Sequence, residues 1–532
     1  MILDLGEGAS FILREYILVA VAALAAYAGA AGGVFHFDDF SIFADPAITS
    51  SSGWYEVWQP MQTRPLTWFT FWLNHALGGD NPLGYHLFNF LAHLATALLL
   101  RLALWRLMPG PVGFMAALLF AVHPMASETV CYVFARSSLL ATFFCVGALD
   151  AWGRKRHWEA AAWFAAALLA KEECAAFPIF LLALHVSVSR DKRELPAIQA
   201  MTAMAALAGL RVIYGLRFIG EGGGPYRAGI HPLDYFAMQG LMIPRYLARL
   251  IVPVNFSIDP DFPLALAPWG WLGWAAICGL VYLAYSRFDR AREGFWFIGG
   301  LILLLPGSSV FPVADLSADR RMYLPMIAFS VAAAFLFQRV SKIAFAAIVV
   351  LLAGLSIERT IVWRSGETLW AEAMNAAPDK LRPKIQLARA LPPDAAIKLL
   401  NEAKKTNPDE PLVASELGRA YVAAGRASDA LPEFGRALAL RPNDARALSN
   451  RGAALLALGH KDTAKPDFEQ ALRADPCLFE ARYQLRAMGV ATEPRPGCNY
   501  TGEQRRLLED SAATPPQSGL DSGGFRGNRK PR

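Results

Sequence analysis

The sequence predicts an all-α protein in which a polytopic membrane domain of about eleven helical spans precedes a short α-solenoid of repeats. Apolar runs recur up to about residue 360, and over the whole chain 55% of residues are hydrophobic and 18% are charged. Ordinary soluble domains carry about 25% charged residues, so this balance favours a membrane protein. Beyond residue 360 the segments are rich in Ala and in charged residues, and prolines recur there every 34 residues.

These changes in composition divide the chain into three parts. We expect a membrane domain at 1–360, a repeat domain at 361–493 and a disordered tail at 494–532, which is polar and rich in Pro, Gly and Ser. The six Cys residues include no CxxC pair and no Cys/His spacing typical of zinc sites, so a structural zinc is not expected.

The apolar runs are predicted to be spans because a helix needs about 20 apolar residues to cross a bilayer. The first run, 11–33, could also be a signal peptide, but it exceeds the usual signal core, and we favour an uncleaved span. The further spans are expected at 83–105, 111–123, 135–152, 158–170, 175–189, 197–214, 267–286, 295–312, 323–339 and 341–357.

Basic clusters orient these spans. Groups of Arg and Lys near 101, 154, 190, 287 and 339 fall between alternate spans, and such clusters collect in cytoplasmic loops. The alternation requires that 235–253, which contains Pro244 and two arginines, does not cross the membrane. The chain is then a multi-pass protein of the cytoplasmic membrane, with its N-terminus inside and its repeat domain outside, in the periplasm (or the lumen in a eukaryote).

The net charge of +6 arises largely from the clusters that orient the spans. No basic stretch is interleaved with aromatic residues in the way that a single-strand channel requires, so no nucleic-acid partner is expected.

Asp38 and Asp39 follow the first span directly, on the predicted outer side. An ionised Asp at the bilayer centre costs about 2.5–3.5 kcal/mol on insertion scales, so the pair must lie at the surface or face a wet cavity. Carboxylates at that depth can meet a lipid headgroup and a water-soluble acceptor together. The alternative is an ordinary solvated loop, since charged residues are usually exposed.

Further polar side chains fall at the outer ends of the spans. They are Arg64, His86, Asn89, His93, His123, Glu128, Arg136, Lys171, Glu172, Arg320 and Arg321. Cations kept on the side that usually lacks them indicate an anionic ligand, and Arg can bind phosphate through two parallel hydrogen bonds. These residues could instead have structural roles. His93 could be a packing residue, Lys171 and Glu172 could neutralise each other, and Arg320 could be an interfacial cation.

These groups suit glycosyl transfer from a lipid phosphate. A carboxylate accepts the proton of the attacking hydroxyl, and cations stabilise the phosphate that leaves. Two adjacent Asp need a proton or a cation between them. Asp38, Asp39 and Glu128 could therefore bind Mg²⁺ or Mn²⁺ through oxygen ligands, although the sequence alone does not establish a metal.

The C-terminal part repeats with a period of 34 residues, as Pro408, Pro442 and Pro476 show. The recurring pairs are Gly418 with Gly452, Gly425 with Gly459, Ala430 with Ala464, Phe434 with Phe468, and Ala437 with Ala471. This period predicts tetratricopeptide repeats, with a degenerate copy at 378–407 before two copies that match the repeat pattern well. Such arrays usually bind a peptide on the concave face; the alternative is a structural cap without a ligand.

An ordered set of short motifs adds a family resemblance. In chain order they are Phe37-Asp38-Asp39, Arg64-Pro65-Leu66-Thr67, Gly84-Tyr85-His86-Leu87-Phe88-Asn89 with His93, Phe120-Ala121-Val122-His123-Pro124 with Glu128 and Arg136, Lys171-Glu172, and Arg321-Met322-Tyr323-Leu324-Pro325. Together with the repeats, this order resembles the TMTC-type proteins, which are transmembrane, tetratricopeptide-repeat-containing O-mannosyltransferases of the GT-C glycosyltransferase superfamily. The resemblance extends to about residue 490, and the Ala-rich composition favours a bacterial homologue.

The resemblance implies a GT-C-like fold and an inverting transferase that takes a sugar from a polyprenyl-phosphate donor, with Asp38 and Asp39 as the catalytic residues. Residues expected to bind the donor and its phosphate are Arg64, His86, His123, Lys171, Arg320 and Arg321. The acceptor is expected to be a protein or peptide recruited through the repeats, or a surface glycan. The array is shorter than in eukaryotic members, so their protein substrates do not carry over.

Two other functions also fit the sequence. One is an oligosaccharide or polymer ligase of the same superfamily, and the other is a non-enzymatic membrane scaffold that binds partners through its repeats. Cys477 and Cys498 both fall outside in the predicted topology, and we predict that they form a disulfide.

Overall fold

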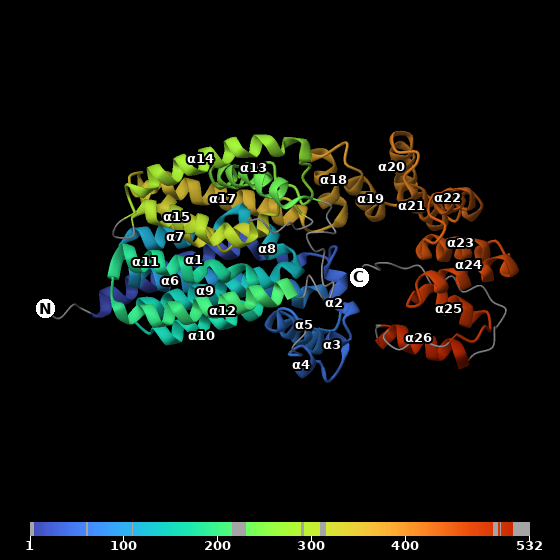
Figure 1. Cartoon of the computed structure of the whole chain (residues 1–532), viewed down its shortest axis with the longest axis horizontal. Helices are drawn as coiled ribbons and strands as arrows, with labels where there is room; N and C mark the ends of the chain where they lie inside the picture. The colour runs from blue at the N-terminus through green and yellow to red at the C-terminus, as the bar shows by residue number, and fades with distance from the viewer. Residues whose placement is uncertain are drawn as a thin grey trace. The chain divides into compact units, whose positions relative to one another are not determined.

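The computed structural model describes residues 5–59, 62–108, 110–214, 230–288, 292–308, 315–492, 498, 500 and 502–513. Within these residues the chain is helical and contains no strand. It divides into two units, one formed by Met1–Ile42 and Ser50–Thr368 and the other by Phe43–Thr49 and Leu369–Arg532 (Figure 1). We expected the boundary at 360/361, whereas the units divide at 368/369, inside a helix.

The α-helices lie as follows along the chain. They are α1 (Leu5–Tyr27), α2 (Asp39–Ala44), α3 (Pro46–Thr49), α4 (Gly53–Glu56), α5 (Pro65–Gly78), α6 (Pro82–Leu107), α7 (Pro111–Val122), α8 (Ser127–Cys131), α9 (Arg136–Gly153), α10 (His157–Ala170), α11 (Phe177–Leu184), α12 (Leu195–Tyr214), α13 (Pro232–Ile251), α14 (Ala267–Tyr285), α15 (Glu293–Leu304), α16 (Met326–Phe337), α17 (Lys342–Val362), α18 (Gly366–Ala376), α19 (Leu381–Ala390), α20 (Pro393–Thr406), α21 (Pro411–Ala423), α22 (Ala427–Leu440), α23 (Ala445–Ala457), α24 (Lys461–Ala474), α25 (Phe479–Ala487) and α26 (Gly502–Ala513).

Short 3₁₀ and π turns continue or link these helices. They are η1 (Ala28–Gly32), η2 (Pro124–Ala126), η3 (Val133–Ala135), η4 (Glu172–Ala176), η5 (His185–Ser189), η6 (Lys192–Glu194), η8 (Leu264–Leu266), η10 (Leu305–Gly307) and η11 (Asp319–Met322).

As far as the structure describes them, the eleven expected spans each fall on one to three consecutive helical elements. In the described part, seven segments are long and apolar enough to cross a membrane: Ile12–Gly32, Pro82–Leu107, Val133–Gly153, Glu172–Ser189, Lys192–Tyr214, Leu264–Tyr285 and Lys342–Val362. An eighth is reached if Pro111–Val122 and Pro124–Cys131, which bend by 51°, form one broken span.

The other expected spans are shorter helices. Segment 158–170 is the 14-residue α10, and 323–339 contains the 12-residue α16. Segment 295–312 corresponds to Glu293–Gly307, and its last residues lie outside the described part. Since a 12-residue helix extends about 18 Å, less than a bilayer core of about 30 Å, the total of eleven spans stays a prediction.

The segment that we expected not to cross, 235–253, lies in α13. This helix is not among the described segments that are long and apolar enough to cross a membrane. It packs against α14 instead (Figure 1), and a Cβ at Gly240 would lie 2.0 Å from the carbonyl oxygen of Gly270. Only glycine permits this approach of two helix backbones.

A buried arginine connects three helices at the end of the bundle that contains Asp38 and Asp39. Nε of Arg136 donates to Oδ1 of Asn89 at 2.8 Å, and its Nη2 donates to the Tyr85 carbonyl at 2.9 Å. The guanidinium also lies 4.5 Å from the ring centroid of Phe71. These contacts connect the start of α9 to α5 and α6, which supports a structural role for Arg136.

Several helices break at this same end of the bundle. His123 is extended before Pro124, because a residue preceding proline avoids the helical region, and Lys171 is extended after α10. η11 contacts η2 and α8, while η4 contacts α9 and η10. The breaks therefore bring irregular backbone together, and this is where the predicted site residues lie.

The repeat unit contains paired helices from α19 onward. A Cβ at Gly418 would lie 2.7 Å from the Phe434 ring, and one at Gly452 would lie 2.9 Å from the Phe468 ring. The glycines thus permit the close helix contact that repeats every 34 residues. The degenerate repeat expected at 378–407 corresponds to the helix pair α19 and α20.

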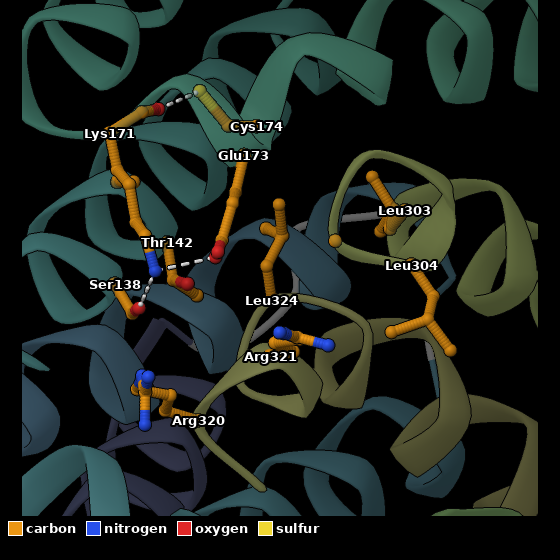
Figure 2. A pocket seen from close by; sticks show the side chains of 12 residues that line it. Ser138, Thr142, Lys171, Glu173, Cys174, Leu303, Leu304, Arg320, Arg321 and Leu324 are labelled. Atoms are coloured by element: carbon orange, nitrogen blue, oxygen red, sulfur yellow. Dashed lines mark hydrogen bonds and ion pairs between the residues drawn. The ribbon is translucent and has the colours of Figure 1, made fainter. Parts of the chain in front are cut away.

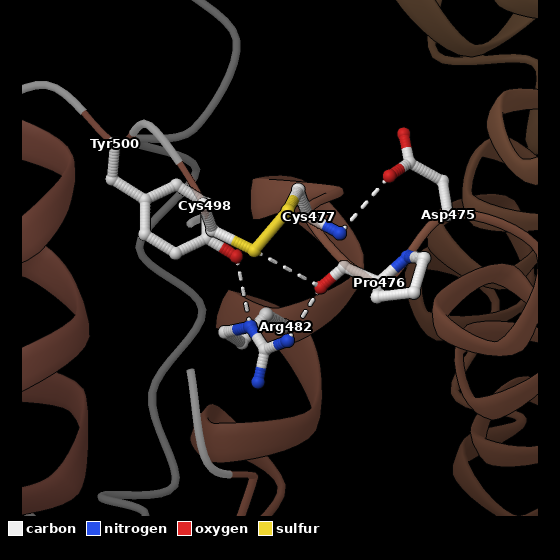
Figure 3. The surroundings of a disulfide bond; sticks show 6 residues. All are labelled: Asp475, Pro476, Cys477, Arg482, Cys498 and Tyr500. Carbon is white, nitrogen blue, oxygen red and sulfur yellow. Dashed lines mark hydrogen bonds between the residues drawn. A yellow bond between two sulfur atoms is a disulfide. The ribbon is translucent and has the colours of Figure 1, made fainter. Parts of the chain in front are cut away.

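The end of the array contains the disulfide Cys477–Cys498 (Figure 3). Arg482 lies beside it, with Nε donating to the hydroxyl of Tyr500 at 2.9 Å and Nη2 donating to the Pro476 carbonyl at 2.6 Å. The guanidinium therefore ties the segment before α25 to the segment after it.

The predicted disordered tail, 494–532, requires a correction in part. Residues 502–513 form α26, which packs on α25, and Nη1 of Arg486 donates to the Leu508 carbonyl at 2.6 Å. A helix is favoured there because Glu, Gln, Arg and Leu are good helix formers. Most of the remaining tail lies outside the described residues.

Candidate functional site

The acidic doublet lies at the start of α2, after a turn in which Phe37 has a left-handed φ of 43°. Asp39 is fully buried, and both of its carboxylate oxygens accept main-chain hydrogen bonds. Oδ2 accepts from the His36 N–H at 2.8 Å and Oδ1 from the Phe134 N–H at 2.7 Å. Asp39 therefore closes the turn and attaches it to the segment between α8 and α9.

Burial raises the pKa of Asp39 to about 8, although the N–H groups of His36 and Phe134 oppose the shift and Asp38 adds to it. A carboxyl in this position holds its proton to a much higher pH than a solvated Asp does. Together with its two hydrogen bonds, this environment suits a structural role better than contact with substrate.

Asp38 has the opposite environment, because its side chain is exposed. Its Oδ2 accepts a hydrogen bond from the hydroxyl of Tyr132 at 3.0 Å, and its main-chain N–H donates to the same hydroxyl oxygen at 3.2 Å. Asp38 is thus the member of the doublet that a ligand can reach.

Tyr132 is itself held in place. Its carbonyl accepts from Nδ2 of Asn89 at 3.2 Å, and its ring stacks on Trp363 with centroids 5.9 Å apart. The carbonyl of Trp363 accepts a hydrogen bond of 2.9 Å from Nε2 of His36, and burial lowers the pKa of that histidine. A neutral His36 and the aromatic pair therefore connect the acidic turn to the C-terminal end of α17.

The predicted cations gather at the same end, and most of them carry a carboxylate partner. Arg64 donates from Nε to Oε2 of Glu172 at 2.9 Å and from Nη2 to Oε1 of the same carboxylate. Nζ of Lys171 lies 2.6 Å from Oε2 of Glu173 and donates to the Ser138 hydroxyl at 2.8 Å. These two cations are neutralised within the protein.

Arg320 is neutralised as well. Its Nη1 lies 2.5 Å from Oε1 of Glu128 and its Nη2 lies 3.1 Å from Oδ2 of Asp315. Glu128 also accepts the main-chain N–H of Arg320, through Oε2 at 3.1 Å. Arg320 is close enough to Tyr132 to interact with it electrostatically, so these charges adjoin the acidic turn.

Arg321 differs from the other three cations. Its Nη2 donates to the Asp315 carbonyl at 2.6 Å, and its Nη1 donates to the Leu316 carbonyl and to the Tyr235 hydroxyl, both at 3.3 Å. Within the described residues no carboxylate forms an ion pair with it. Its guanidinium is therefore oriented by neutral oxygens, and Glu173 acts on it only through a longer-range electrostatic interaction among the residues that the structure describes.

A small pocket lies among these side chains (Figure 2). Its polar lining includes Lys171, Glu173, Arg320 and Arg321, and its apolar lining includes Leu303, Leu304 and Leu324. Figure 2 shows Leu303 and Leu304 on the side away from Lys171, with Leu324 between Glu173 and Arg321. The pocket thus combines a charged wall with an apolar one.

The predicted histidines do not line this pocket. His86 is fully buried below the acidic turn, where its ring stacks on Phe35 with centroids 6.4 Å apart and packs against Gly33. Nε2 of His123 is joined to the Leu250 carbonyl at 3.1 Å. In the structure both histidines pack within the protein, and their predicted contact with the donor stays a prediction.

His123 is fully used within the protein, because its Nδ1 accepts the N–H of Met125 at 3.1 Å. His93, for which packing was one alternative, is likewise hydrogen-bonded to the hydroxyl of Tyr323 at 2.7 Å and to the Ala121 carbonyl at 3.1 Å. Both histidines therefore connect separate segments of the helix bundle.

The predicted metal ligands are not brought together. Asp39 accepts main-chain hydrogen bonds with both oxygens, and Glu128 binds Arg320 with both. Over the part of the chain that the structure describes, no group of three His, Cys, Asp or Glu side chains could hold a metal ion. The donor set does not fit a divalent cation, and we assign no step to one.

Two contributors to the site were not predicted: Tyr132 and Trp363. Tyr132 and Trp363 stand in no motif, and both act through partners far along the chain. Glu173 and Asp315 belong to the same polar stretches as Lys171 and Arg320, and the structure shows them as ion-pair partners of these two cations.

Comparisons with known proteins first confirm the repeats. A family model described as TPR repeat matches residues 418–459, and one described as tetratricopeptide repeat matches residues 445–476. These ranges fall on α21 to α24.

The chain is also similar to curated proteins along most of its length. It is 23% identical over 72% of its length to Protein O-mannosyl-transferase F38B6.6 of Caenorhabditis elegans and covers 61% of that protein. It is 22% identical over 71% of its length to Protein O-mannosyl-transferase TMTC3 of Homo sapiens and covers 48% of it.

A shorter stretch is more similar. Over 82 residues, 15% of this chain and 10% of the relative, the identity to Protein O-mannosyl-transferase TMTC2 of Mus musculus is 45%. The chain spans between about half and three fifths of the length of the relatives that it matches most fully.

Proposed function

We propose that this chain, which is TMTC-like in sequence and in the order of its membrane helices and tetratricopeptide repeats, is a membrane glycosyltransferase. It moves a sugar from a polyprenyl-phosphate donor to a hydroxyl of a protein acceptor. The observation that carries the proposal is the exposed carboxylate of Asp38, fixed by Tyr132 beside a group of cations.

Asp38 acts as the general base. Its carboxylate accepts the proton of the acceptor hydroxyl while that oxygen attacks the anomeric carbon. The bond between this carbon and the phosphate oxygen breaks, and the polyprenyl phosphate leaves with the electron pair. Attack from the face opposite the phosphate inverts the anomeric centre.

Arg321 is the cation best suited to the leaving phosphate. Arg64, Lys171 and Arg320 already bind carboxylates, whereas the guanidinium of Arg321 is oriented by two carbonyls and a tyrosine hydroxyl. A positive charge that has no carboxylate partner within the described residues and is already oriented stabilises a developing phosphate charge at low reorganisation cost.

The lining of the pocket supports a lipid-linked donor. Lys171 lies on one side of it, Leu303 and Leu304 lie on the opposite side, and Arg321 and Leu324 lie between them (Figure 2). A polyprenyl phosphate has the same division, with an anionic head on an apolar chain. The charged wall therefore suits the phosphate and the leucine wall suits the first isoprene units.

The site and the repeats are proposed to act on the outer side of the cytoplasmic membrane. The Cys477–Cys498 disulfide supports this placement for the repeat unit, because disulfides persist in oxidising compartments. Mass mapping of protein purified from the membrane should find Cys477 and Cys498 joined and Cys278, which is exposed, as a free thiol. Free thiols at 477 and 498 would contradict the placement.

The function is tested by transfer in reconstituted membranes. The full chain is placed in nanodiscs with a panel of polyprenyl-phosphate hexoses, mannose included, and Ser/Thr peptides, and transferred sugar is measured by mass spectrometry. Asp38→Asn should lower transfer by about 100-fold or more, since a general base contributes about 10²–10⁴-fold. Asp80→Asn, at an exposed carboxylate that pairs only with His75 among the described residues, is the matched control.

The same assay separates the alternatives. A ligase transfers a preassembled oligosaccharide from a lipid pyrophosphate but no single hexose, so donors of both kinds are compared. A scaffold transfers neither, and in cells its phenotype survives Asp38→Asn. Wild-type rates in Asp38→Asn would overturn the proposal.

A further inference from the structure

The hydroxyl of Tyr132 makes two hydrogen bonds to the same residue. It accepts the main-chain N–H of Asp38 at 3.2 Å and donates its own proton to Oδ2 of Asp38 at 3.0 Å. Because the hydroxyl oxygen receives the N–H, its proton points toward the carboxylate. The turn and the side chain of Asp38 are thus fixed by one group.

The second carboxylate oxygen is left available. Oδ1 of Asp38 forms no hydrogen bond with any residue that the structure describes, and the side chain is exposed. A carboxylate with one oxygen held and the other open has a defined direction from which a hydroxyl can approach. Such orientation is what a general base requires before its basicity matters.

Tyr132 is well placed to hold this geometry, because it cannot readily move. It is 3% exposed, its carbonyl accepts from Asn89, and its ring lies between Trp363 and Phe37. Asn89 is in turn held by Arg136, at 2.8 Å. The hydroxyl therefore sits on a chain of contacts that reaches into the helix bundle.

The hydroxyl also stays a donor over the working pH range. Burial and the nearby Asp38 carboxylate raise the pKa of Tyr132. A neutral phenol favours the charged form of the carboxylate that accepts from it. The bond is therefore present when Asp38 is ready to take a proton.

We propose that Tyr132 is the positioning residue of the transferase: it holds Oδ2 of Asp38 so that Oδ1 receives the proton of the acceptor hydroxyl. This inference rests on the proposed function. Asp39 accepts a hydrogen bond from the main-chain N–H of Phe134, two residues after Tyr132. This bond fixes the main chain that carries Tyr132 against the acidic turn. Asp39 thus orients the backbone, whereas Asp38 takes part in the reaction.

The test compares Tyr132→Phe with wild type in the transfer assay. The ring and its stacking on Trp363 remain, and only the hydroxyl is lost. The turnover rate should fall by about 10-fold to 100-fold, the size of a lost hydrogen bond to a charged group. The KM for the lipid donor should change by less than about twofold, because the hydroxyl does not contact the phosphate site.

The pH–rate profile gives the readout that a purely structural role would not move. Without the phenol, the charged carboxylate loses a stabilising donor, so the acidic limb of the profile should move to higher pH. Tyr282→Phe, at a residue 80% exposed on α14, is the control and should keep the wild-type profile.

A second variant keeps the proposal falsifiable if Tyr132→Phe does not fold. Replacement of Tyr132 by 3-fluorotyrosine retains the ring and the hydroxyl but strengthens the donor, so the acidic limb should move to lower pH. Wild-type turnover and an unmoved limb in both variants would overturn the inference while Asp38→Asn remains inactive. Failure of the wild-type chain to transfer any sugar would instead overturn the proposed function.

Discussion

Arg320 and Glu128 are 192 residues apart in the sequence and meet through two contacts. Nη1 of Arg320 lies 2.5 Å from Oε1 of Glu128, and the main-chain N–H of Arg320 donates to Oε2 at 3.1 Å. The pair joins η11 to α8 beside the acidic turn. Glu128 is thereby a partner for a cation, which is a different role from the predicted metal ligand.

Glu128→Gln tests this assignment. The amide cannot neutralise Arg320, so the free energy of unfolding should fall by about 1–3 kcal/mol, less than for a fully buried pair because Arg320 is partly exposed. Thermal unfolding of the purified full chain measures the change. Glu358→Gln, at an exposed carboxylate of α17, should leave the midpoint unchanged. An unchanged midpoint in Glu128→Gln, with loss of activation by added Mg²⁺ or Mn²⁺, would favour the metal role instead.

The pH dependence of stability should carry a contribution from Asp39. Its pKa is raised from 3.8 to about 8, so the folded protein holds a proton that the unfolded chain releases. This contribution is full below about pH 4, is lost progressively as the pH rises, and is gone above about pH 8. The thermal midpoint of the full chain is measured between these limits.

Asp39→Asn removes the titration and is the comparison for that experiment. The variant should be less stable than wild type at low pH by about 1–3 kcal/mol. Its amide oxygen can accept one of the two main-chain N–H groups, but its NH₂ group cannot accept the other, whether that is His36 or Phe134. The difference from wild type should shrink as the pH rises. A difference that grows with pH would mean that the Asp39 carboxylate is ionised in the folded protein.

Arg321 and Arg64 should respond differently to loss of charge. Arg321→Gln should raise the KM for the lipid donor by about 10-fold to 100-fold, the effect of a lost hydrogen bond to a charged phosphate. Initial rates over a range of donor concentrations measure it. Arg321→Lys, which keeps the charge but loses the planar fork, should recover part of the affinity.

Arg64→Gln is the contrasting variant. It leaves Glu172 without its partner, so stability should fall, and the double variant Arg64→Gln with Glu172→Gln should regain part of the loss. The KM for the donor should change little. A large rise in KM for Arg64→Gln, with none for Arg321→Gln, would reverse the two assignments.

The glycine contacts of the repeats allow a matched pair of substitutions. Gly418→Ala should destabilise the repeat unit by about 1–3 kcal/mol, because the new methyl group would overlap the buried ring of Phe434. Gly435→Ala lies in α22 with no atom within 4 Å of the new methyl group and should stabilise by up to about 1 kcal/mol. Limited proteolysis of the full chain over a temperature series compares them. Equal effects of the two substitutions would exclude the packing explanation.

The sequence was a good guide to the helices and a partial guide to the site. Long apolar runs and the 34-residue period depend on neighbouring residues, so the helices at the expected spans and the paired repeat helices could be predicted from them. The helix at 502–513 was missed because a polar composition was taken as disorder, although its residues are good helix formers.

The division of labour within the doublet could not be predicted. Asp38 and Asp39 are adjacent, yet their partners Tyr132 and Phe134 lie 94 and 95 residues away. His123 is a second example: it was expected to bind the donor, but its ring is hydrogen-bonded to the Leu250 carbonyl, 127 residues away. Which polar group stays open to a ligand is decided by such distant contacts.

The helix pairs of the C-terminal unit meet through Gly418 with Phe434 and again through Gly452 with Phe468, at the same spacing. An array built from one recurring contact has no intrinsic length, because each copy needs only its neighbour. A further copy inserted after Asp444 would meet ready-made surfaces on both sides. The reach of this unit toward a partner can therefore change by whole units of 34 residues while the membrane chemistry stays as it is.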